Sequence, residues 1–294
     1  MVMAVPELDT AALSFRAPGA ELFVPDGAAP AHALARTTHL GVGAHPDDLE
    51  IMAYHGILEC FQQSDRWFTG VTMTNGGGHV RGLATMGLTG AETIEVRKRE
   101  QNAAAHIGEY STMLLLNHPS AAVKDATNAD VAADLDLVFS VTRPEVVYTH
   151  NLADKHESHV AVALRVVAAL RRLPAGERPR RVIGCEVWRG LDWLCDEDKV
   201  MMAVDGRPDL AEALLRVFDS QIGGGKRYDL ATQGRRLANA TFFESHLVDQ
   251  HDALIWGLDL TPLVADSTRD PGTFVEEYIA RFAADVRMRL DRMS

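Results

Sequence analysis

"HLGVGAHPDDLE", residues 39–50, is the stretch that decides the fold. Its first six residues form a short apolar run, which is typical of a buried strand. His45, Asp47 and Asp48 follow directly, and apolar residues then recur near helical spacing as far as residue 63. Strongly hydrated side chains are a poor end for a strand in a core, because their burial without partners is costly. We therefore expect them to face a functional site.

The same alternation of strand and helix continues along the chain. Strands are predicted at residues 67–74, 111–117, 144–150 and 180–188, and helices at 91–109, 128–143, 156–173, about 207–219, 229–243 and 272–292. Residues 75–90 are a glycine-rich loop. The alternation predicts an α/β fold, with a Rossmann-like, mostly parallel sheet flanked by helices. We expect an irregular N-terminal extension at 1–37, an α/β core at 38–190, and a helical C-terminal part at 191–294 that completes the same domain.

A second polar cluster, "THNLADKHESH", follows the strand predicted at 144–150. It contains His150, and also His156 and His159, whose i,i+3 spacing places both on one side of a helix start. Ligands of open α/β sheets bind beyond the carboxyl ends of the strands, so both clusters are expected at one edge. Imidazoles and carboxylates together suit Zn²⁺ or another borderline divalent ion.

Each cluster taken alone has a simpler interpretation. Asp47 or Asp48 is a suitable N-cap for the helix that follows, and a histidine after a strand is usually a surface residue. Two histidines three residues apart on a helix do not by themselves indicate a metal site either. Because both clusters are expected at one edge of the sheet, a metal site and the simpler interpretation are equally favoured.

Composition and charge exclude several other classes of protein. The chain of 294 residues has a formal net charge of −12, which argues against nucleic acid or an anionic membrane surface as the main partner. No apolar run approaches 18 residues, so no membrane span is expected. The N-terminus lacks the features of a signal peptide, and the three cysteines contain no CxxC pair. A cytoplasmic location is therefore the natural expectation.

"AHPDDLE" followed far downstream by "HESH" resembles the PIG-L/LmbE family of metal-dependent N-deacetylases. Further similarity comes from "TNGGG" after the second core strand and "RKRE" on the next helix. The resemblance covers about residues 38–190, and a weaker similarity extends over "FDSQ…KRYDLATQGRRLANATFFESH". It implies that His45, Asp48 and His159 bind the metal ion. It also makes Asp47 the general base, His156 the polarising or proton-donating histidine, and Arg97 a residue that contacts the substrate.

The sequence departs from the family pattern at one position beside the last histidine. Where the family often has HxDH, Ser158 replaces the aspartate. This substitution removes a carboxylate that would otherwise tune His156.

The resemblance implies a zinc-dependent hydrolase, with Fe²⁺ and Co²⁺ as alternative metals. Its substrate would be a small N-acylated amino sugar of the N-acetylglucosamine type, or a conjugate of one, from which it removes an acyl group, most simply acetyl. Members of the family often assemble, so a homo-oligomer is compatible with the resemblance. Two alternatives stay open: an amidase of the same family for a thiol conjugate or natural-product intermediate, and a non-catalytic α/β module that binds a ligand.

Overall fold

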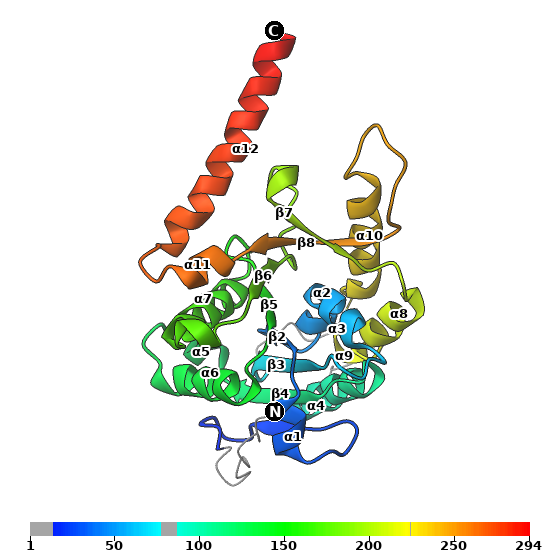
Figure 1. The fold of residues 1–294 in the computed structure, drawn as a ribbon. Helices are drawn as coiled ribbons and strands as arrows, with labels where there is room; N and C mark the ends of the chain where they lie inside the picture. The colour runs from blue at the N-terminus through cyan, green and yellow to red at the C-terminus, as the bar shows by residue number, and fades with distance from the viewer. Residues whose placement is uncertain (1–13, 78–86, 224) are drawn as a thin grey trace.

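The computed structural model describes residues 14–77, 87–223 and 225–294. In this part of the chain, an eight-stranded sheet has the order β1-β4-β3-β2-β5-β6-β8-β7 (Figure 1). The five central strands are parallel: β4 (Thr112–His118), β3 (Phe68–Thr74), β2 (His39–Gly43), β5 (Val146–His150) and β6 (Arg181–Cys185). Antiparallel strands complete both edges: β1 (Glu21–Phe23), β8 (Leu254–Asp259) and β7 (Lys199–Ala203).

Helices cover both faces of this sheet, as the near-continuous apolar character of its parallel strands requires. One face carries α1 (Pro30–Ala35), α5 (Ser120–Lys124), α6 (Ala129–Thr142), α7 (Glu157–Arg172) and α11 (Thr261–Ala265). The other carries α2 (Asp48–Met52), α3 (Tyr54–Cys60), α4 (Gly90–Ile107), α8 (Pro208–Arg216), α9 (Asp219–Ile222) and α10 (Tyr228–Thr241). A separate cluster of buried apolar side chains lies on each face of the sheet.

The predicted fold class, a mostly parallel sheet flanked by helices, is confirmed. The helix predicted at 48–63 is divided at Ala53 into α2 and α3. The C-terminal part contains the expected helices, the last of which is α12 (Pro271–Met293), and it also supplies β7 and β8. Residues 78–86 of the glycine-rich loop and residues 1–13 of the N-terminal extension lie outside the described residues.

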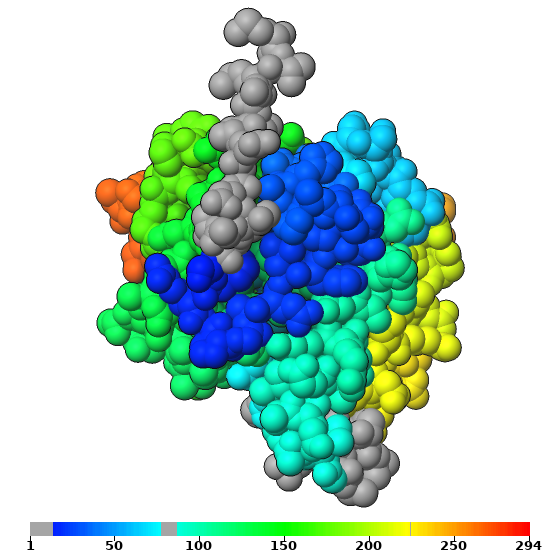
Figure 2. All heavy atoms as spheres, turned by 90° about the horizontal axis from the view of Figure 1, so that it is seen from below, coloured from blue at the N-terminus to red at the C-terminus, as the bar shows by residue number. Residues whose placement is uncertain are grey.

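The described part of the N-terminal extension is tied to the body of the protein. β1 pairs with β4, and the Arg16 backbone N–H donates a hydrogen bond of 2.9 Å to the Asp134 carboxylate on α6. The Asn117 side-chain amide donates to the Pro18 carbonyl at 2.6 Å. In the view from below, this segment (dark blue) lies on the surface of the molecule (Figure 2). Its strand β1 covers the outer side of β4, and its Pro18 carbonyl meets Asn117 near the carboxyl end of β4.

The strand order creates a switch point between β2 and β5. From β2 the chain proceeds through β3 to β4 on one side of the sheet, whereas β5 leads to β6 on the other side. Connections diverge there, which leaves a crevice at the carboxyl ends of the two strands. Gly43 ends β2, and a Cβ at this position would meet the Asp48 Cβ at 3.0 Å. Glycine thus allows the first polar cluster to fold back over the end of its own strand.

No helix among the described residues has both the length and the apolar character needed to cross a membrane.

Candidate metal centre

The loop after β2 holds an unfavourable backbone conformation. Asp47 has φ +87°, in the left-handed region, which costs a non-glycine residue about 1–3 kcal/mol. Surrounding groups hold the loop in place: the Thr74 hydroxyl donates to the Ala44 carbonyl at 2.7 Å, and the Gln221 amide donates to the Pro46 carbonyl at 3.0 Å. Asp47 occupies the N-cap position of α2, but its side chain makes no capping hydrogen bond. The capping interpretation therefore does not account for this carboxylate.

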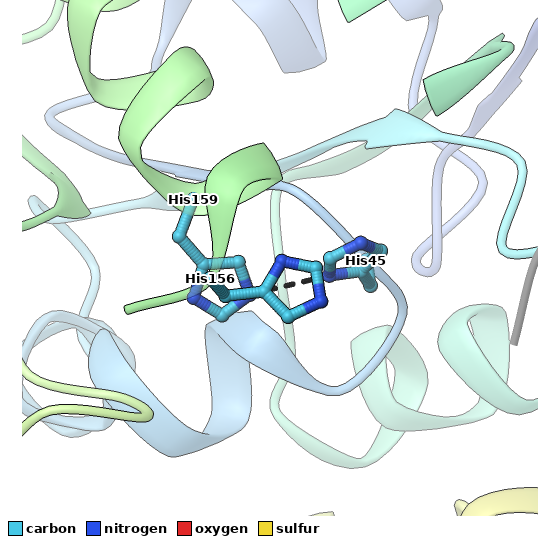
Figure 3. A group of neighbouring side chains, drawn as sticks. All are labelled: His45, His156 and His159. Carbon is cyan, nitrogen blue, oxygen red and sulfur yellow. Dashed lines mark hydrogen bonds between the residues drawn. The ribbon is translucent and has the colours of Figure 1, made fainter. Parts of the chain in front are cut away.

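Three side chains from the two polar clusters converge beyond β2 and β5. His45 Nδ1 lies 3.2 Å from His159 Nε2 and 3.2 Å from Asp48 Oδ2, and His159 Nε2 lies 3.4 Å from Asp48 Oδ1. Figure 3 shows how His45, from the loop after β2, faces His159 and His156, from the start of α7. Asp48 and His159 are buried, whereas the His45 side chain is 23% exposed. The group is therefore reached from the side of His45.

The spacing of these three donor groups, in which a different oxygen of Asp48 faces each histidine, fits a divalent ion. Ligands at about 2.0–2.1 Å from a tetrahedral zinc ion are about 3.3–3.4 Å apart, which matches the three distances in this group. Among the described residues, two overlapping sets of three donors lie within 4.8 Å of one another: Asp48, His150 and His159, and His45, His156 and His159. His45, Asp48 and His159 together supply two imidazole nitrogens and one carboxylate, the donor types of a catalytic zinc site in which three protein ligands leave one position open. His45, Asp48 and His159 could therefore hold the metal.

The charges of Asp48 and His159 stabilise each other. Burial would raise the pKa of Asp48, but His159 and His150 hold it well below its usual range. Burial would likewise lower the pKa of His159, but Asp48 and then Asp154 raise it. Asp48 is accordingly an ionised carboxylate, the form in which it binds a cation.

His150 is near enough to belong to the donor group but is already engaged. Its Nε2 lies 3.3 Å from Asp48 Oδ2, and it accepts a hydrogen bond of 2.9 Å from the Ala44 backbone N–H. Burial, followed by the effect of His159, lowers the pKa of His150 to about 4, so the ring is neutral and able to accept. It stacks on the His159 ring with centroids 3.8 Å apart. His150 therefore orients His159 and the loop after β2, while its Nε2 lone pair is occupied.

Asp154 supplies a carboxylate behind His159. Its Oδ2 lies 3.6 Å from His159 Nδ1, and its Oδ1 accepts a hydrogen bond of 2.9 Å from the His156 backbone N–H. A carboxylate behind a ligating histidine fixes the orientation and tautomer of the ring. Ser158 is buried and its hydroxyl lies 3.0 Å from the Ser120 hydroxyl. The carboxylate missing at Ser158 thus has a counterpart four residues earlier, directed at His159.

Asp47 lies beside the donor group without joining it. Its Oδ2 accepts a hydrogen bond of 2.5 Å from the Gln221 amide, and its backbone N–H donates to the Gln101 side-chain carbonyl at 3.2 Å. Burial, and then the neighbouring Asp48 charge, raise the pKa of Asp47 well above its usual range. A carboxylate with a raised pKa is a better proton acceptor, which suits a general base.

His156 stands at the open side of the site. Its ring is 4.9 Å from the His45 ring and 4.7 Å from the His159 ring, measured between centroids. Burial, and then His159 and His45, lower its pKa. Trp188 lies beyond it at 6.2 Å, and Tyr228 contacts Trp188 edge-on at 6.0 Å. The mouth of the site is therefore lined by aromatic side chains.

Arg97 lies deeper than a substrate-contacting residue at the mouth would. Its side chain is buried, and its guanidinium donates a hydrogen bond of 2.9 Å to the Gly76 carbonyl. Burial lowers the pKa of Arg97, whereas the charge of Asp47 raises it. Arg97 thus places a positive charge behind the carboxylate of Asp47.

The structure brings five of the six residues singled out from the sequence around one point, with Arg97 behind them. Three residues that contact the candidate centre were not predicted: His150 as an orienting group, Asp154 and Gln221. The sequence predicted that His150 lies at the end of a strand, but it did not predict the hydrogen bond that His150 accepts from the Ala44 backbone N–H. Gln221 belongs to the "FDSQ" segment that resembles the family, which was a usable signal. Nothing in the sequence separated Asp154 from other loop aspartates.

Comparison with protein families agrees with this geometry. Residues 40–170 match the PIG-L family, described as GlcNAc-PI de-N-acetylase. The chain carries a PIG-L family domain. The matched range contains both polar clusters of the PIG-L domain, from β2 to most of α7.

Proteins similar to this chain in sequence or in fold have names that give different reactions. An uncharacterized deacetylase of Escherichia coli K12, YaiS, is 26% identical over 135 residues, covering 46% of this chain and 69% of that protein. The N,N′-diacetylchitobiose deacetylase of Pyrococcus horikoshii is 16% identical, with a TM-score of 0.56 and coverage of 74% and 83% of the two chains. GalB, the 4-carboxy-2-hydroxymuconate hydratase of Pseudomonas putida KT2440, is 18% identical, with a TM-score of 0.57 and coverage of 77% and 97%. Since a hydratase shares the fold, the reaction has to be argued from the site.

Proposed function

We propose that this protein is a metal-dependent N-deacetylase that acts on a small N-acetylated amino sugar or its conjugate. The observation that carries the proposal is the triangle of His45 Nδ1, Asp48 and His159 Nε2, whose edges are 3.2–3.4 Å, with the separate carboxylate of Asp47 beside it. Such a donor set suits Zn²⁺, and Fe²⁺ or Co²⁺ are alternatives. A divalent ion held there supplies Lewis acidity to an amide carbonyl and acidifies water at neutral pH.

Asp47 accepts the proton of the attacking water. Its raised pKa makes it a stronger base than a solvated aspartate, and Gln221 fixes the direction of its carboxylate. The strained backbone at Asp47 makes the base and the ligand Asp48 diverge, although they are consecutive residues. Asp48 can thus bind the metal ion while Asp47 accepts the proton.

His156 acts on the other side of the amide. Its half-buried ring faces the open side, where the oxyanion of the tetrahedral intermediate develops, and one donor to such an oxyanion typically contributes about 10²–10³ in rate. The same ring delivers a proton to the leaving amine, which leaves as a primary amine together with acetate.

Arg97 is proposed to contact the substrate from its buried position behind Asp47. Its guanidinium limits the rise in the pKa of Asp47 and directs a positive charge at the carbonyl of Gly76 and the space beside it. Replacing it with methionine is expected to raise KM more than it lowers kcat. An unchanged KM for the Arg97→Met variant would remove Arg97 from the substrate contacts.

The experiment is acetate release from a panel of N-acetylated substrates: N-acetylglucosaminides, N-acetylated thiol conjugates and an N-acyl natural-product glycoside. We expect turnover of the amino sugars by the metal-loaded protein, and a loss of about 10²–10⁴ in kcat for Asp47→Asn with the metal retained. Turnover of only the thiol conjugate or the natural product would select the alternative amidases. A metal-loaded protein that releases acetate from none of them, or an Asp47→Asn variant with full activity, would contradict the proposal.

A further inference from the structure

Helix α12 projects away from the body of the protein (Figure 1). Its base is anchored: Asp270 caps the helix by accepting a hydrogen bond of 2.8 Å from the Thr273 backbone N–H, and Phe274 is fully buried. Two turns further, the guanidinium of Arg281 bonds to Asp198 at 2.8 Å and lies over the Tyr278 ring. Of the residues of α12, which are all described, Phe274 alone is buried. The part of the helix beyond Arg281 therefore has little packing against its own subunit.

A second row of side chains on α12 is apolar and faces solvent beyond its first member, Val275, which packs partly against the core of its own subunit. It lies one residue on from the anchoring row, and therefore about 100° around the helix. Its outer members are 49% (Ile279), 39% (Val286), 58% (Leu290) and 85% (Met293) exposed. The full row, which we term the α12 stripe, consists of Val275, Ile279, Phe282, Val286, Leu290 and Met293.

The α12 stripe is unusual for a surface helix. Helices in proteins owe most of their stability to packing of an apolar face, and such a face is stabilised by about 25 cal/mol for each Å² of apolar area buried. Spacings of three and four residues, sustained over the whole helix, are those of a seam between two helices. The stripe thus has the pattern of a helix–helix interface, and no helix within residues 14–77, 87–223 and 225–294 packs extensively against it.

The α12 stripe is nearly symmetric about Ala284. Phe282 and Val286 lie two residues on either side of this midpoint, and Val275 and Met293 lie nine on either side. Ile279 and Leu290 lie five and six residues from it. A two-fold interface places the same patch of both copies face to face. Because the apolar residues of the stripe are spaced almost equally on either side of its midpoint, two antiparallel copies place apolar residues opposite one another.

The charges of α12 favour the same direction. Glu276, Glu277 and Arg281 give its first half a net charge of −1. Its second half carries Arg287, Arg289 and Arg292 against Asp285 and Asp291, a net charge of +1. Antiparallel pairing opposes unlike halves, whereas parallel pairing opposes like halves. The helix as a whole is neutral, unlike the cationic helices that lie on membrane surfaces.

We propose that the α12 stripe is the interface with a second copy of this chain, in which the two α12 helices pack antiparallel around a two-fold axis near Ala284. The tip of each helix then lies beside the base of the other, and the two bodies lie at opposite ends of the seam. Pairing covers the exposed stripe of both copies at once.

The first test is the molar mass in solution, measured by light scattering after size exclusion. The unaltered chain is expected at twice the 32.1 kDa chain mass, and Val286→Asp with Leu290→Asp at 32.1 kDa. Ala284→Asp, an exposed position on the side away from the stripe, is the matched control and is expected to keep the dimer. Far-UV circular dichroism verifies that the variants fold. A monomeric unaltered chain, including one that instead sediments with anionic vesicles, would overturn the proposal.

The second test fixes the direction of pairing. In a Cys195→Ser background, a chain with both Val275→Cys and Met293→Cys is expected to form a covalent dimer on mild oxidation. Each single variant is expected to remain uncrosslinked, because its two copies would be about 27 Å apart along the seam. Crosslinking by the single variants would show parallel pairing and would contradict the antiparallel arrangement.

Discussion

At the scale of single residues, two adjacent carboxylates have surroundings that shift their pKa values in opposite directions. Burial and the Asp48 charge raise the pKa of Asp47, while His159 and His150 overcome burial to hold the pKa of Asp48 low. Groups whose surroundings move their pKa values apart are the expected base and ligand of a catalytic site. The left-handed backbone at Asp47 makes this possible, because it turns consecutive side chains in different directions.

Replacing Gln221 tests how far the base depends on its support. The Gln221→Leu variant loses the hydrogen bond that orients the Asp47 carboxylate, so we expect kcat to fall about 10–100-fold while the metal content is unchanged. Gln233→Leu, at an exposed position on α10, is the control. A Gln221→Leu variant with the kcat of the unaltered protein would show that Asp47 needs no such support.

His39 is expected to make stability depend on pH. Burial lowers its pKa from 6.5 to about 4 in the folded chain, so between these values the unfolded chain binds a proton that the folded chain does not. The contribution of His39 should therefore make stability fall as pH drops from 6.5 to 4, by up to about 3 kcal/mol, and should change no further below 4. His39→Gln should lack this contribution and keep the similar one of His150, whose pKa is also lowered to about 4. Urea unfolding of both proteins at pH 7.5, 5.5 and 4 measures it, and parallel pH profiles would contradict the assignment.

At the scale of elements, the start of α7 is built around Asp154. This carboxylate accepts hydrogen bonds from the backbone N–H of His156 and, at 3.1 Å, from that of Trp188. It also faces His159 Nδ1. It therefore links the beginning of the helix, the aromatic mouth and a candidate ligand. Movement of any one of these should affect the other two.

The Asp154→Asn variant is expected to weaken metal binding about 10–100-fold, because His159 loses the charge behind its ring. Asp192→Asn, whose side chain is 96% exposed, is the control and should bind metal normally. Competition with a chromophoric chelator measures both dissociation constants. Equal values would mean that Asp154 orders the loop without influencing the ligand.

Two glycines within helices are expected to respond oppositely to alanine. A Cβ at Gly56 in α3 would meet the Tyr148 ring at 2.4 Å, so Gly56→Ala should lower the unfolding free energy by about 1–3 kcal/mol. A Cβ at Gly234 in α10 would have nothing within 4 Å, so Gly234→Ala should raise it by about 0.4–1 kcal/mol. Thermal melts of the two variants compare the signs. Destabilisation by both substitutions would show that α10 needs Gly234 for another reason.

At the scale of the whole molecule, the alternating strands and helices of the parallel sheet could be predicted from the sequence. The strands β2, β3 and β5 and the helix α7 are each marked by apolar periodicity and by polar residues at their ends, so their limits lie within one or two residues of prediction. The edge of the sheet that carries the site follows from the same alternation. The sequence alone therefore predicts that the two distant polar clusters lie together.

What the sequence did not predict depends on contacts between distant segments. Strand β8 contains Gly257, where a Cβ would meet Ile183 at 2.4 Å, so its place depends on packing against β6. His150 was distinguished from a ligand by its bond to Ala44, and Asp154 from other aspartates by its position behind His159. Such roles follow from hydrogen-bond directions, which residue spacing does not specify.

The measurement that bears most directly on the account is metal content, determined by elemental analysis after saturation with Zn²⁺ and removal of the excess. We expect one ion per chain in the unaltered protein, in Asp47→Asn and in His150→Gln. We expect none in His45→Ala, Asp48→Ala and His159→Ala, because each removes a corner of the donor triangle. An ion that persists in His45→Ala and is lost from His150→Gln would contradict the proposed centre.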